Sequence, residues 1–451
     1  MSSGHDEYEV IDGYFLDTDR IRAVGDRVER TVAEANRRLS EETRGGPEDS
    51  PEEYRARAER VIAQILDEDA GRALSEGRQV LDADTEASVS AGALARVCGL
   101  GPLQPFLDDP GIENININGV HVWVRRSDGT RERHDSVFDD PDEIVALVRR
   151  LASESPSGER RFDPGAPILD MQLPGGERLN AVMEVSRQPS VSIRRHRYSS
   201  TTLETLRDLG TVDDVLLPLL RAGVRSRRNM VVTGGTGAGK TTLLRALAAE
   251  VPAEERIVTI EDVFELGLDR DRAAHPDCVA LQARPANVEG VGEITIADLV
   301  RTALRMSPDR VIVGETRGHE TVPLLNAMSQ GNDGSLTTLH AANSSGAFTK
   351  LGAYAAQSAE RLPLEATASL VAAAVHLVVH VSALPTGGRM VTSVREVVGA
   401  EGQNVVSNEI YRRDRNGPLP AATPSPVTMD ALAEGGFDFA TLHSENAGWL
   451  R

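Results

Sequence analysis

The sequence predicts an α/β protein whose largest part is built on a central, mainly parallel sheet. Strand and helix patterns alternate from the apolar strand "NMVVT" to about residue 400, as a parallel sheet requires. A glycine-rich loop, "GGTGAGKT" at 234–241, joins that strand to a helix. Acidic side chains end two later strands, in "RIVTIEDVFEL" at 256–266 and "DRVIVGETRG" at 309–318. These features indicate a fold that binds phosphate groups at one edge of its sheet.

The chain before this region is predicted to hold a lead-in, a helical segment and a small α/β domain. Residues 1–50 are acidic and polar, which indicates a flexible lead-in with some helix. Apolar side chains at three-to-four spacing predict helices over 51–98. Residues 99–200 alternate apolar and polar side chains around the turn Asp128-Gly129, and a helix through 144–151 and further strands follow. We expect this part to be a small α/β domain of its own.

The next region, 201–400, is predicted to be one domain, followed by a loop-rich tail over 401–451. Two helix patterns, through Leu203 and through Leu216, lead into the strand of the glycine-rich loop. The longest apolar run, 370–384, is shorter than a membrane span and contains two histidines. We interpret it as a buried helix end that continues into a strand. The tail contains "NGPLPAATPSP", a composition typical of loops.

Composition limits the class of protein and its partners. Charged residues at 26% and apolar residues at 40% are typical of a folded globular chain without a membrane span. The net charge of −20 disfavours nucleic acid as the main partner, because phosphate backbones bind to Lys and Arg. The N-terminal stretch lacks the basic leader and apolar segment of a secretory signal, so we expect a cytoplasmic protein.

Cysteine and lysine are both rare. Cys98 and Cys278 are far apart and in no metal-ligand spacing, so we interpret them as small core residues in a reducing compartment. Lys240 and Lys350 are the only lysines among the 49 Lys and Arg residues. A lysine retained where arginine fills nearly every basic position indicates a site that needs a compact ammonium group.

The glycine-rich loop has the pattern of a nucleotide phosphate site. Its glycines let backbone N–H groups and the N-terminus of the following helix face the phosphates. Lys240 is placed to reach the β- and γ-phosphates, and the Thr241 hydroxyl to bind Mg²⁺. Neither lysine lies in the [NT]-K-x-D stretch that reads guanine, so ATP is the expected nucleotide. The loop residues assigned to nucleotide binding are Gly234, Gly235, Thr236, Gly237, Ala238, Gly239, Lys240, Thr241 and Thr242.

The strand ends supply candidate acids for metal binding and catalysis. Many phosphate-loop ATPases place Asp and often Glu after the second strand, whereas this chain has Gly314 and then Glu315. Glu315 is placed to orient or deprotonate the attacking water, and Arg317 to meet phosphate or a neighbouring subunit. Glu261 and Asp262 either cap the next helix or supply the Mg²⁺ ligand that Gly314 cannot.

A further strand ends in a histidine, in "GSLTTLHAANS" at 334–344. A single His beside apolar residues is often structural. His340 nevertheless follows the Glu315 strand by one helix, where the next strand end of the sheet is expected. There it would sense the γ-phosphate, and on spacing alone both interpretations stay open.

Four stretches together resemble the type II/type IV secretion ATPase superfamily: "GGTGAGKTT", "RIVTIEDVFEL", 280–320 and "GSLTTLHAANS". The resemblance is greatest to the pilus-assembly ATPases of tight-adherence (Tad/Flp) systems, the CpaF type, and it runs from residue 99 to about 400. In that superfamily the strand that carries the catalytic acid ends in Gly-Glu. The missing Asp is therefore a feature of the family that the chain resembles.

The resemblance implies a homohexamer of two-domain subunits. ATP and Mg²⁺ would be held between the N-terminal domain and a RecA-like P-loop NTPase domain. Arg178, Arg194 and Arg195 would reach the phosphates from the N-terminal side, although on sequence alone they could equally be surface charges. The resemblance also favours the sensing role of His340.

The sequence departs from the family pattern at two places, and both bear on the rate of ATP hydrolysis. The last box reads "HAANSSGAF" where relatives usually read His-Ala-Asn-Ser and then Pro-Arg, and "SQGNDG" stands where "TGHDG" is commoner. Hydrolysis could therefore be slow. The resemblance leaves the catalytic base open between Glu261 and Glu315.

Three functions are compatible with these patterns. The first is a cytoplasmic ATPase motor at the inner face of the plasma membrane, which powers pilus assembly or protein secretion through an inner-membrane platform protein. The second is a RecA-like DNA-transfer ATPase, which the acidic balance and the lack of a basic, aromatic-rich groove disfavour. The third is a nucleotide-bound assembly scaffold with little turnover, favoured only by the altered last box.

Overall fold

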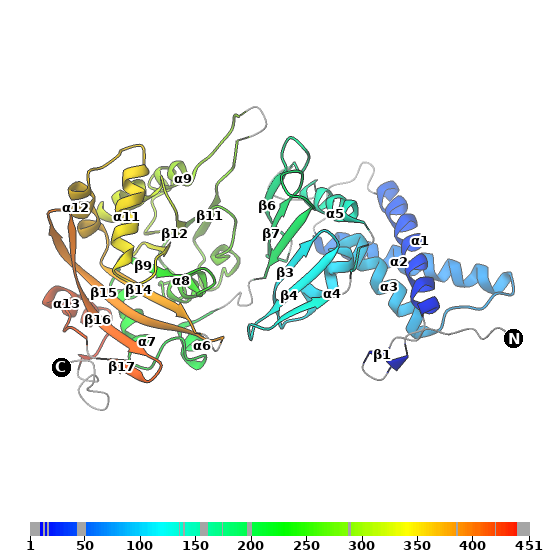
Figure 1. The fold of residues 1–451 in the computed structure, drawn as a ribbon, viewed down its shortest axis with the longest axis horizontal. Coiled ribbons are helices and arrows are strands. Elements are labelled where there is room, and N and C mark those ends of the chain that lie inside the picture. Colours follow the sequence, from blue (N-terminus) through cyan, green and yellow to red (C-terminus); the bar gives the residue numbers. More distant parts are fainter. Residues whose placement is uncertain are drawn as a thin grey trace.

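The protein consists of three parts that follow one another along its long axis (Figure 1). A bundle of helices comes first, then a six-stranded antiparallel sheet, and then a nine-stranded, mainly parallel sheet. The computed structural model describes residues 10–11, 14–15, 18–42, 51–134, 136–138, 140–153, 161–173, 175–195, 201–286, 290–384, 387–419 and 421–439. A short strand pair, β1 (Val10–Ile11) and β2 (Tyr14–Phe15), precedes the bundle. The predicted α/β fold class is confirmed.

Three helices form the N-terminal bundle: α1 (Thr18–Glu42), α2 (Pro51–Ser75) and α3 (Ala83–Cys98). The prediction of a flexible lead-in over 1–50 is wrong for the part that α1 occupies. Val28, Ala35 and Leu39 lie on one stripe of α1 and are buried in the core that α1 shares with α2 and α3. The acidic composition did not reveal this stripe, because a packed helix needs only a narrow row of apolar side chains.

The six-stranded sheet has the order β5-β4-β3-β8-β7-β6, and all its neighbouring strands are antiparallel. Its strands and helices are η1 (Gly101–Leu103), α4 (Gln104–Asp108), β3 (Ile112–Asn118), β4 (His121–Arg126), β5 (Arg131–His134), α5 (Pro141–Ser153), β6 (Ile168–Gln172), β7 (Arg178–Val182) and β8 (Ser190–Arg194). Alternate side chains such as Ile115 and Ile193 are buried against α5. The opposite face carries polar pairs, such as Ser192 donating to Asn116 Oδ1 at 3.0 Å.

The nine-stranded sheet has the order β11-β10-β12-β13-β9-β14-β15-β16-β17, with parallel pairing from β11 to β14 and antiparallel pairing beyond. Its strands are β9 (Met230–Gly234), β10 (Ile257–Glu261), β11 (Cys278–Gln282), β12 (Arg310–Thr316), β13 (Leu336–His340), β14 (Leu377–Ala383), β15 (Arg389–Glu401), β16 (Asn404–Asp414) and β17 (Gly417–Leu419). The central strands β9 and β10 are buried along their whole length. This is expected of parallel strands with helices on both faces.

Helices cover both faces of this sheet. One face packs against α6 (Leu203–Asp208), α7 (Leu216–Arg225), α8 (Lys240–Ala248) and α13 (Pro426–Glu434). The other face packs against α9 (Ile296–Ala303), α10 (Thr321–Ser329), α11 (Gly346–Gln357) and α12 (Leu364–Ala374). A short 3-10 helix, η2 (Leu268–Arg270), follows β10. Within the described residues, no helix is both long and apolar enough to cross a lipid bilayer.

The apolar run 370–384 contains a helix end and a strand, as predicted. The helix α12 ends at Ala374 and β14 begins at Leu377. Cys98 and Cys278 pack at the borders of two hydrophobic clusters. Burial raises the pKa of Cys278 to about 12, so its thiol stays protonated at neutral pH.

The region after residue 400 is not the loop-rich tail that the sequence predicted. The strand β16 pairs along β15, and α13 packs on α7 through Leu432. Ile410 and Tyr411 on β16 are fully buried. The proline-rich stretch "NGPLPAATPSP" contains β17 and leads to α13. The prediction of loops from its composition therefore missed regular elements in this region.

Replacing Tyr411 by Phe is expected to lower the free energy of unfolding by about 1–3 kcal/mol. The buried Tyr411 hydroxyl donates to Asp213 Oδ2 at 2.6 Å, and Asp213 Oδ1 accepts the Leu216 N–H at the start of α7. The substitution leaves this carboxylate without its hydroxyl partner. Denaturant unfolding followed by circular dichroism measures the change, with Tyr354→Phe on α11 as the control. Equal stability of Tyr411→Phe and the wild type would contradict this role.

Candidate functional site

Four neighbouring parallel strands bring the sequence motifs to one edge of the large sheet. Their order is β10-β12-β13-β9, and parallel strands present their carboxyl ends at the same edge. The glycine-rich loop follows β9, His340 ends β13, Glu315 lies near the end of β12 and Glu261 ends β10. The structure therefore places the four predicted motifs side by side.

The loop between β9 and α8 has the conformation that its glycines allow. Gly237 and Gly239 adopt positive φ angles of 73° and 95°, which other residues rarely adopt. A Cβ on Gly234 would lie 2.4 Å from the carbonyl oxygen of Val381, so no side chain fits there. Lys240 is the first residue of α8, with Thr241 and Thr242 directly after it in the first turn. Glycine is thus required for the curled backbone of this loop.

Lys240, His340, Glu315 and Arg317 form a continuous polar row. Lys240 Nζ donates to the carbonyl of Gly235 at 3.1 Å and lies 3.2 Å from His340 Nδ1. His340 Nε2 lies 2.7 Å from Glu315 Oε1. Arg317 donates to Glu315 Oε2 at 2.6 Å. The row links the glycine-rich loop to the strand end that carries the predicted catalytic acid.

Burial lowers the pKa of two members of this row, Lys240 and His340. Desolvation lowers the pKa of Lys240, and the nearby Glu315 carboxylate opposes that change. Desolvation, followed by the nearby Lys240 charge, lowers the pKa of His340. His340 is therefore neutral at pH 7, as a ring packed against an ammonium group requires.

The side chain of Glu261 occupies the space beside Gly314. A Cβ on Gly314 would lie 3.1 Å from Glu261 Cγ, closer than ordinary contact. Gly314 is also held from the other side, because its carbonyl accepts the Thr338 hydroxyl at 2.8 Å. The neighbouring strand therefore supplies a carboxylate beside Gly314, and a side chain at position 314 would compete with it for space.

Glu261 is deeply buried, with only 3% of its surface exposed. Its Oε1 accepts the backbone N–H groups of Glu265 and Leu266, each at 2.9 Å. Burial raises its pKa to about 7 despite these hydrogen bonds. Its other oxygen, Oε2, is buried without a hydrogen-bond partner among the described residues. Glu261 thus holds the segment that precedes η2 through one oxygen, and its other oxygen is available to a ligand.

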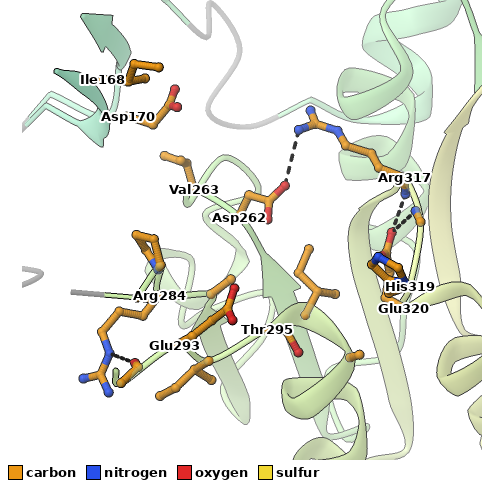
Figure 2. A pocket seen from close by; sticks show the side chains of 18 of the residues that line it. Ile168, Asp170, Asp262, Val263, Arg284, Glu293, Thr295, Arg317, His319 and Glu320 are labelled. Atoms are coloured by element: carbon orange, nitrogen blue, oxygen red, sulfur yellow. Dashed lines mark hydrogen bonds and ion pairs between the residues drawn. The ribbon is translucent and has the colours of Figure 1, made fainter. Parts of the chain in front are cut away.

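Asp262 lies beside Arg317, at the end of the polar row. Its Oδ2 lies 3.3 Å from Arg317 Nη1, and both side chains line a large cavity of about 1290 Å³ (Figure 2). Desolvation raises the pKa of Asp262. Ile168 and Asp170, from the six-stranded sheet, lie on the opposite side of this cavity. The cavity therefore lies between the two sheets, next to the polar row.

The four predicted arginines are divided between two cavities. Arg178 and Arg317 line the large cavity, where Arg178 forms an ion pair with Glu265 at 3.2 Å. Arg194 and Arg195 line a smaller cavity of about 330 Å³ beside the glycine-rich loop. Arg195 donates to the carbonyl of Asp109 at 2.6 Å. All four thus face cavities at the boundary between the two sheets.

The smaller cavity also contains charged residues that sequence reasoning missed: Glu113, Arg125, Arg245 and Arg389. Nothing in their spacing relates them to the glycine-rich loop. Arginine is also so abundant in this chain that its presence alone carries no signal. Only the folded arrangement brings these residues together.

The residues present fit a magnesium nucleotide. Among the described residues, no group of three or more His, Cys, Asp or Glu side chains is arranged to hold a metal ion. Mg²⁺ commonly uses one or two protein oxygens, with water and phosphate oxygens completing its shell. Thr241 in the first turn of α8 and the unpartnered Glu261 Oε2 are such groups. A few protein oxygens beside a glycine-rich loop are the arrangement that this ion needs.

Sequence comparison identifies the family. The family model "Type II/IV secretion system protein" matches residues 100–411. A Mycobacterium tuberculosis protein (strain H37Rv) named for conjugal transfer is 36% identical over 342 residues, which cover 74% of this chain and 94% of the relative. The type IV secretion system protein VirB11 of Brucella suis is 33% identical over 314 residues, which cover 62% of this chain and 84% of the relative.

Two solved structures are also similar. The VirB11 ATPase of the Brucella suis type IV secretion system, in complex with sulphate, is 31% identical, with coverage of 65% of this chain and 92% of that chain and a TM-score of 0.36. The pilus retraction motor PilT with bound ADP is 19% identical, with coverage of 76% and 88% and a TM-score of 0.47. At these TM-scores the assignment rests on the sequence matches. The family model and a 36% identical relative both span most of the chain, which therefore belongs to the type II/IV secretion ATPase superfamily.

Proposed function

We propose that the protein is a Mg²⁺-dependent ATPase that powers pilus assembly or protein secretion. The observation that carries this proposal is the polar row from Lys240 through His340 and Glu315 to Arg317 at the carboxyl edge of the sheet. Such a row provides, within one site, a cation that binds the phosphates and a carboxylate that can take a proton from the attacking water. Membership of a family of secretion proteins supports the same activity.

The glycine-rich loop and Lys240 bind the triphosphate. The backbone N–H groups of the loop and the N-terminus of α8 face the phosphates. In the structure the Lys240 ammonium is held by the Gly235 carbonyl and the His340 ring, which position it at the end of the loop. On ATP binding it turns to the β- and γ-phosphate oxygens, so His340 senses the γ-phosphate through the movement of this ammonium group.

Glu315 is the general base. Its side chain is 20% exposed, and its Oε1 lies 2.7 Å from His340 Nε2. Arg317 and His340 fix the orientation of the carboxylate. Glu261, in contrast, is buried, and one of its oxygens accepts hydrogen bonds from two backbone N–H groups. Glu315 is therefore the acid that is placed to receive the proton of the attacking water.

Thr241, Glu261 and Asp262 would hold the magnesium ion, in part through water. When bound, the ion neutralises charge on the phosphate oxygens. Asp262 meets Arg317 in the structure. Its carboxylate would therefore act from the outer shell of the ion.

The family and the position of the cavities support a two-domain arrangement with the nucleotide at the boundary. We propose domains over 99–200 and 201–400, with the strands and helix after 400 completing the second domain. Both cavities lie between the two sheets. Gln172, at the end of β6, connects the two proposed domains, because its amide donates to the carbonyl of Phe264 at 2.7 Å. ATP would bind in this boundary, so that closure of one domain on the other drives the stroke.

The working form is proposed to be a homohexamer of the tight-adherence (Tad/Flp) type. It acts in the cytoplasm, at the inner face of the plasma membrane, on an inner-membrane platform protein. Four successive motifs of the secretion ATPase superfamily, whose Tad/Flp members the sequence resembles most, support this proposal. Transfer of DNA is the second candidate, because a 36% identical relative is named for conjugal transfer. Stimulation of hydrolysis by single-stranded DNA distinguishes the two functions.

The test is the rate of Mg²⁺-dependent ATP hydrolysis across protein concentrations. The expected result is a specific activity that rises with concentration, because subunits share sites. Lys240→Ala should lose activity by at least about 100-fold, since it removes the cation that meets the phosphates. Lys350→Ala, the other lysine variant, is the matched control and should retain activity. Absence of nucleotide binding and hydrolysis in the wild-type protein would refute the proposal.

A further inference from the structure

The smaller cavity is surrounded by segments that are distant in the sequence, among them Leu206, Leu209 and Thr211 in and after α6. The glycine-rich loop and the first turn of α8 contribute Thr236, Gly237 and Thr242. The six-stranded sheet contributes residues at the ends of β3, β4 and β8, and the start of β15 contributes Arg389. Lys240, His340 and Glu315 are not among its lining residues. The cavity therefore adjoins the side of the loop that faces away from the γ-phosphate position.

The described lining of this cavity is strongly cationic. Its arginines are Arg125, Arg194, Arg195, Arg245 and Arg389, and its one carboxylate is Glu113. Five arginines and one carboxylate around about 330 Å³ leave an excess of positive charge that favours binding of a further anion. A nucleotide polyphosphate is an anion of suitable charge, and guanidinium groups bind phosphate oxygens with good geometry.

Arg389 lies directly on the phosphate loop. Its Nε donates to the carbonyl of Gly237 at 3.4 Å, and its Cδ would be 2.9 Å from a Cβ on Gly239. Its Nη2 lies 3.6 Å from Glu113 Oε2. The aliphatic part of the side chain thus packs where Gly239 leaves space, and the guanidinium group bridges the loop to the six-stranded sheet.

Arg125 approaches the same loop from the six-stranded sheet. Its Nη2 lies 3.7 Å from Glu113 Oε2 and 4.0 Å from the position of a Cβ on Gly237. Glu113 is therefore shared by two arginines, one from each sheet. Both contacts are longer than a strong charge-assisted hydrogen bond, so both guanidinium groups retain donors for another partner.

We infer that Arg125 and Arg389 bind the phosphates of the nucleotide next to the nucleoside, in addition to the arginines already assigned. This inference rests on the proposed function. Glu113 holds the pair beside the loop in the structure, and the phosphates would take its place when a nucleotide binds. Since one arginine belongs to each sheet, the nucleotide then joins the two domains directly. The pair contacts phosphates that ADP and ATP share, so it acts on both nucleotides equally.

Equilibrium titration with fluorescent ADP and with a non-hydrolysable ATP analogue tests this inference. Arg125→Met and Arg389→Met remove the charge and keep an unbranched side chain, which in Arg389→Met still packs against Gly239. Each is expected to raise Kd at least about tenfold, by a similar factor for both nucleotides. Arg389→Lys retains a cation and should lose less affinity than Arg389→Met. Arg412→Met, at an exposed position of β16, should bind like the wild type.

The outcomes separate this inference from the proposed function. If the wild-type protein does not bind either nucleotide, the proposed function fails. If the wild type binds, Lys240→Ala does not, and both methionine variants bind like the wild type, only this inference is overturned. An effect at one arginine alone overturns the pairing. A loss for the ATP analogue without a loss for ADP would move the pair to the γ-phosphate. Circular dichroism and thermal unfolding of each variant show whether it is folded.

Discussion

Replacing Glu315 by Gln is expected to lower kcat for ATP hydrolysis by about 10²–10⁴-fold. The amide keeps the size of the side chain and can still accept from Arg317, but it cannot take a proton from water. Nucleotide binding should persist, because the loop and Lys240 are unchanged. A lower kcat with little change in Kd is the signature of a group that acts only in the chemical step. Single-turnover hydrolysis and equilibrium binding measure the two quantities separately.

Glu261→Gln is the matched comparison for this prediction. Its amide oxygen can still accept the N–H groups of Glu265 and Leu266, so the turn after β10 should remain intact. We expect Glu261→Gln to retain more activity than Glu315→Gln, because Glu261 is buried away from the attacking water. The reverse order of activities would make Glu261 the base and assign Glu315 to the orientation of His340.

The position of the four motifs was predictable because it depends on a simple rule. The carboxyl ends of parallel strands meet at one edge, so Glu261, Glu315 and His340 had to lie near the glycine-rich loop once the alternation of strands and helices was recognised. The strand order β10-β12-β13-β9 was not predictable from the sequence, since it depends on how each connection crosses the sheet. That order is what places His340 between Lys240 and Glu315.

The contacts between the two sheets could not be predicted from sequence patterns. The sequence analysis assigned the same phosphate-binding role to Arg178, Arg194 and Arg195, yet Arg178 faces a different cavity from the other two. Arg389 lies within a stretch that reads as an ordinary strand end, and its proximity to Gly239 depends on where β15 lies relative to the glycine-rich loop. Periodicity records which face of an element is buried, but it does not record which distant element covers that face.

The regions that were misjudged share one cause, which is reliance on composition. The acidic N-terminal stretch contains α1, and the proline-containing C-terminal stretch follows the long pair β15 and β16. Leu39 buries α1 in its core, and Tyr411 buries β16 in another. A small number of buried side chains is enough to fix an element when neighbouring elements supply the rest of the core.

Restoring the acid that the sequence lacks, by Gly314→Asp, is expected to destabilise the protein by about 3 kcal/mol and to abolish hydrolysis. The new Cβ would lie 3.1 Å from Glu261 Cγ, so the two side chains compete for one space. Two carboxylates in that space also repel each other, and the pKa of Glu261 is already raised to about 7 by burial. Gly399→Asp on β15, where a Cβ meets nothing within 4 Å, is the control.

A double-mutant cycle isolates this competition. If Glu261 is the reason for Gly314, the variant Gly314→Asp/Glu261→Ala should be more stable than the sum of the two single changes implies, by about 1–3 kcal/mol. Removing Glu261 alone still loses the acceptor for the N–H groups of Glu265 and Leu266, so that single variant sets the baseline. Denaturant unfolding measures the four free energies. Strict additivity would mean that Gly314 is required by the backbone near Thr338, and that the carboxylate of the neighbouring strand is not the cause.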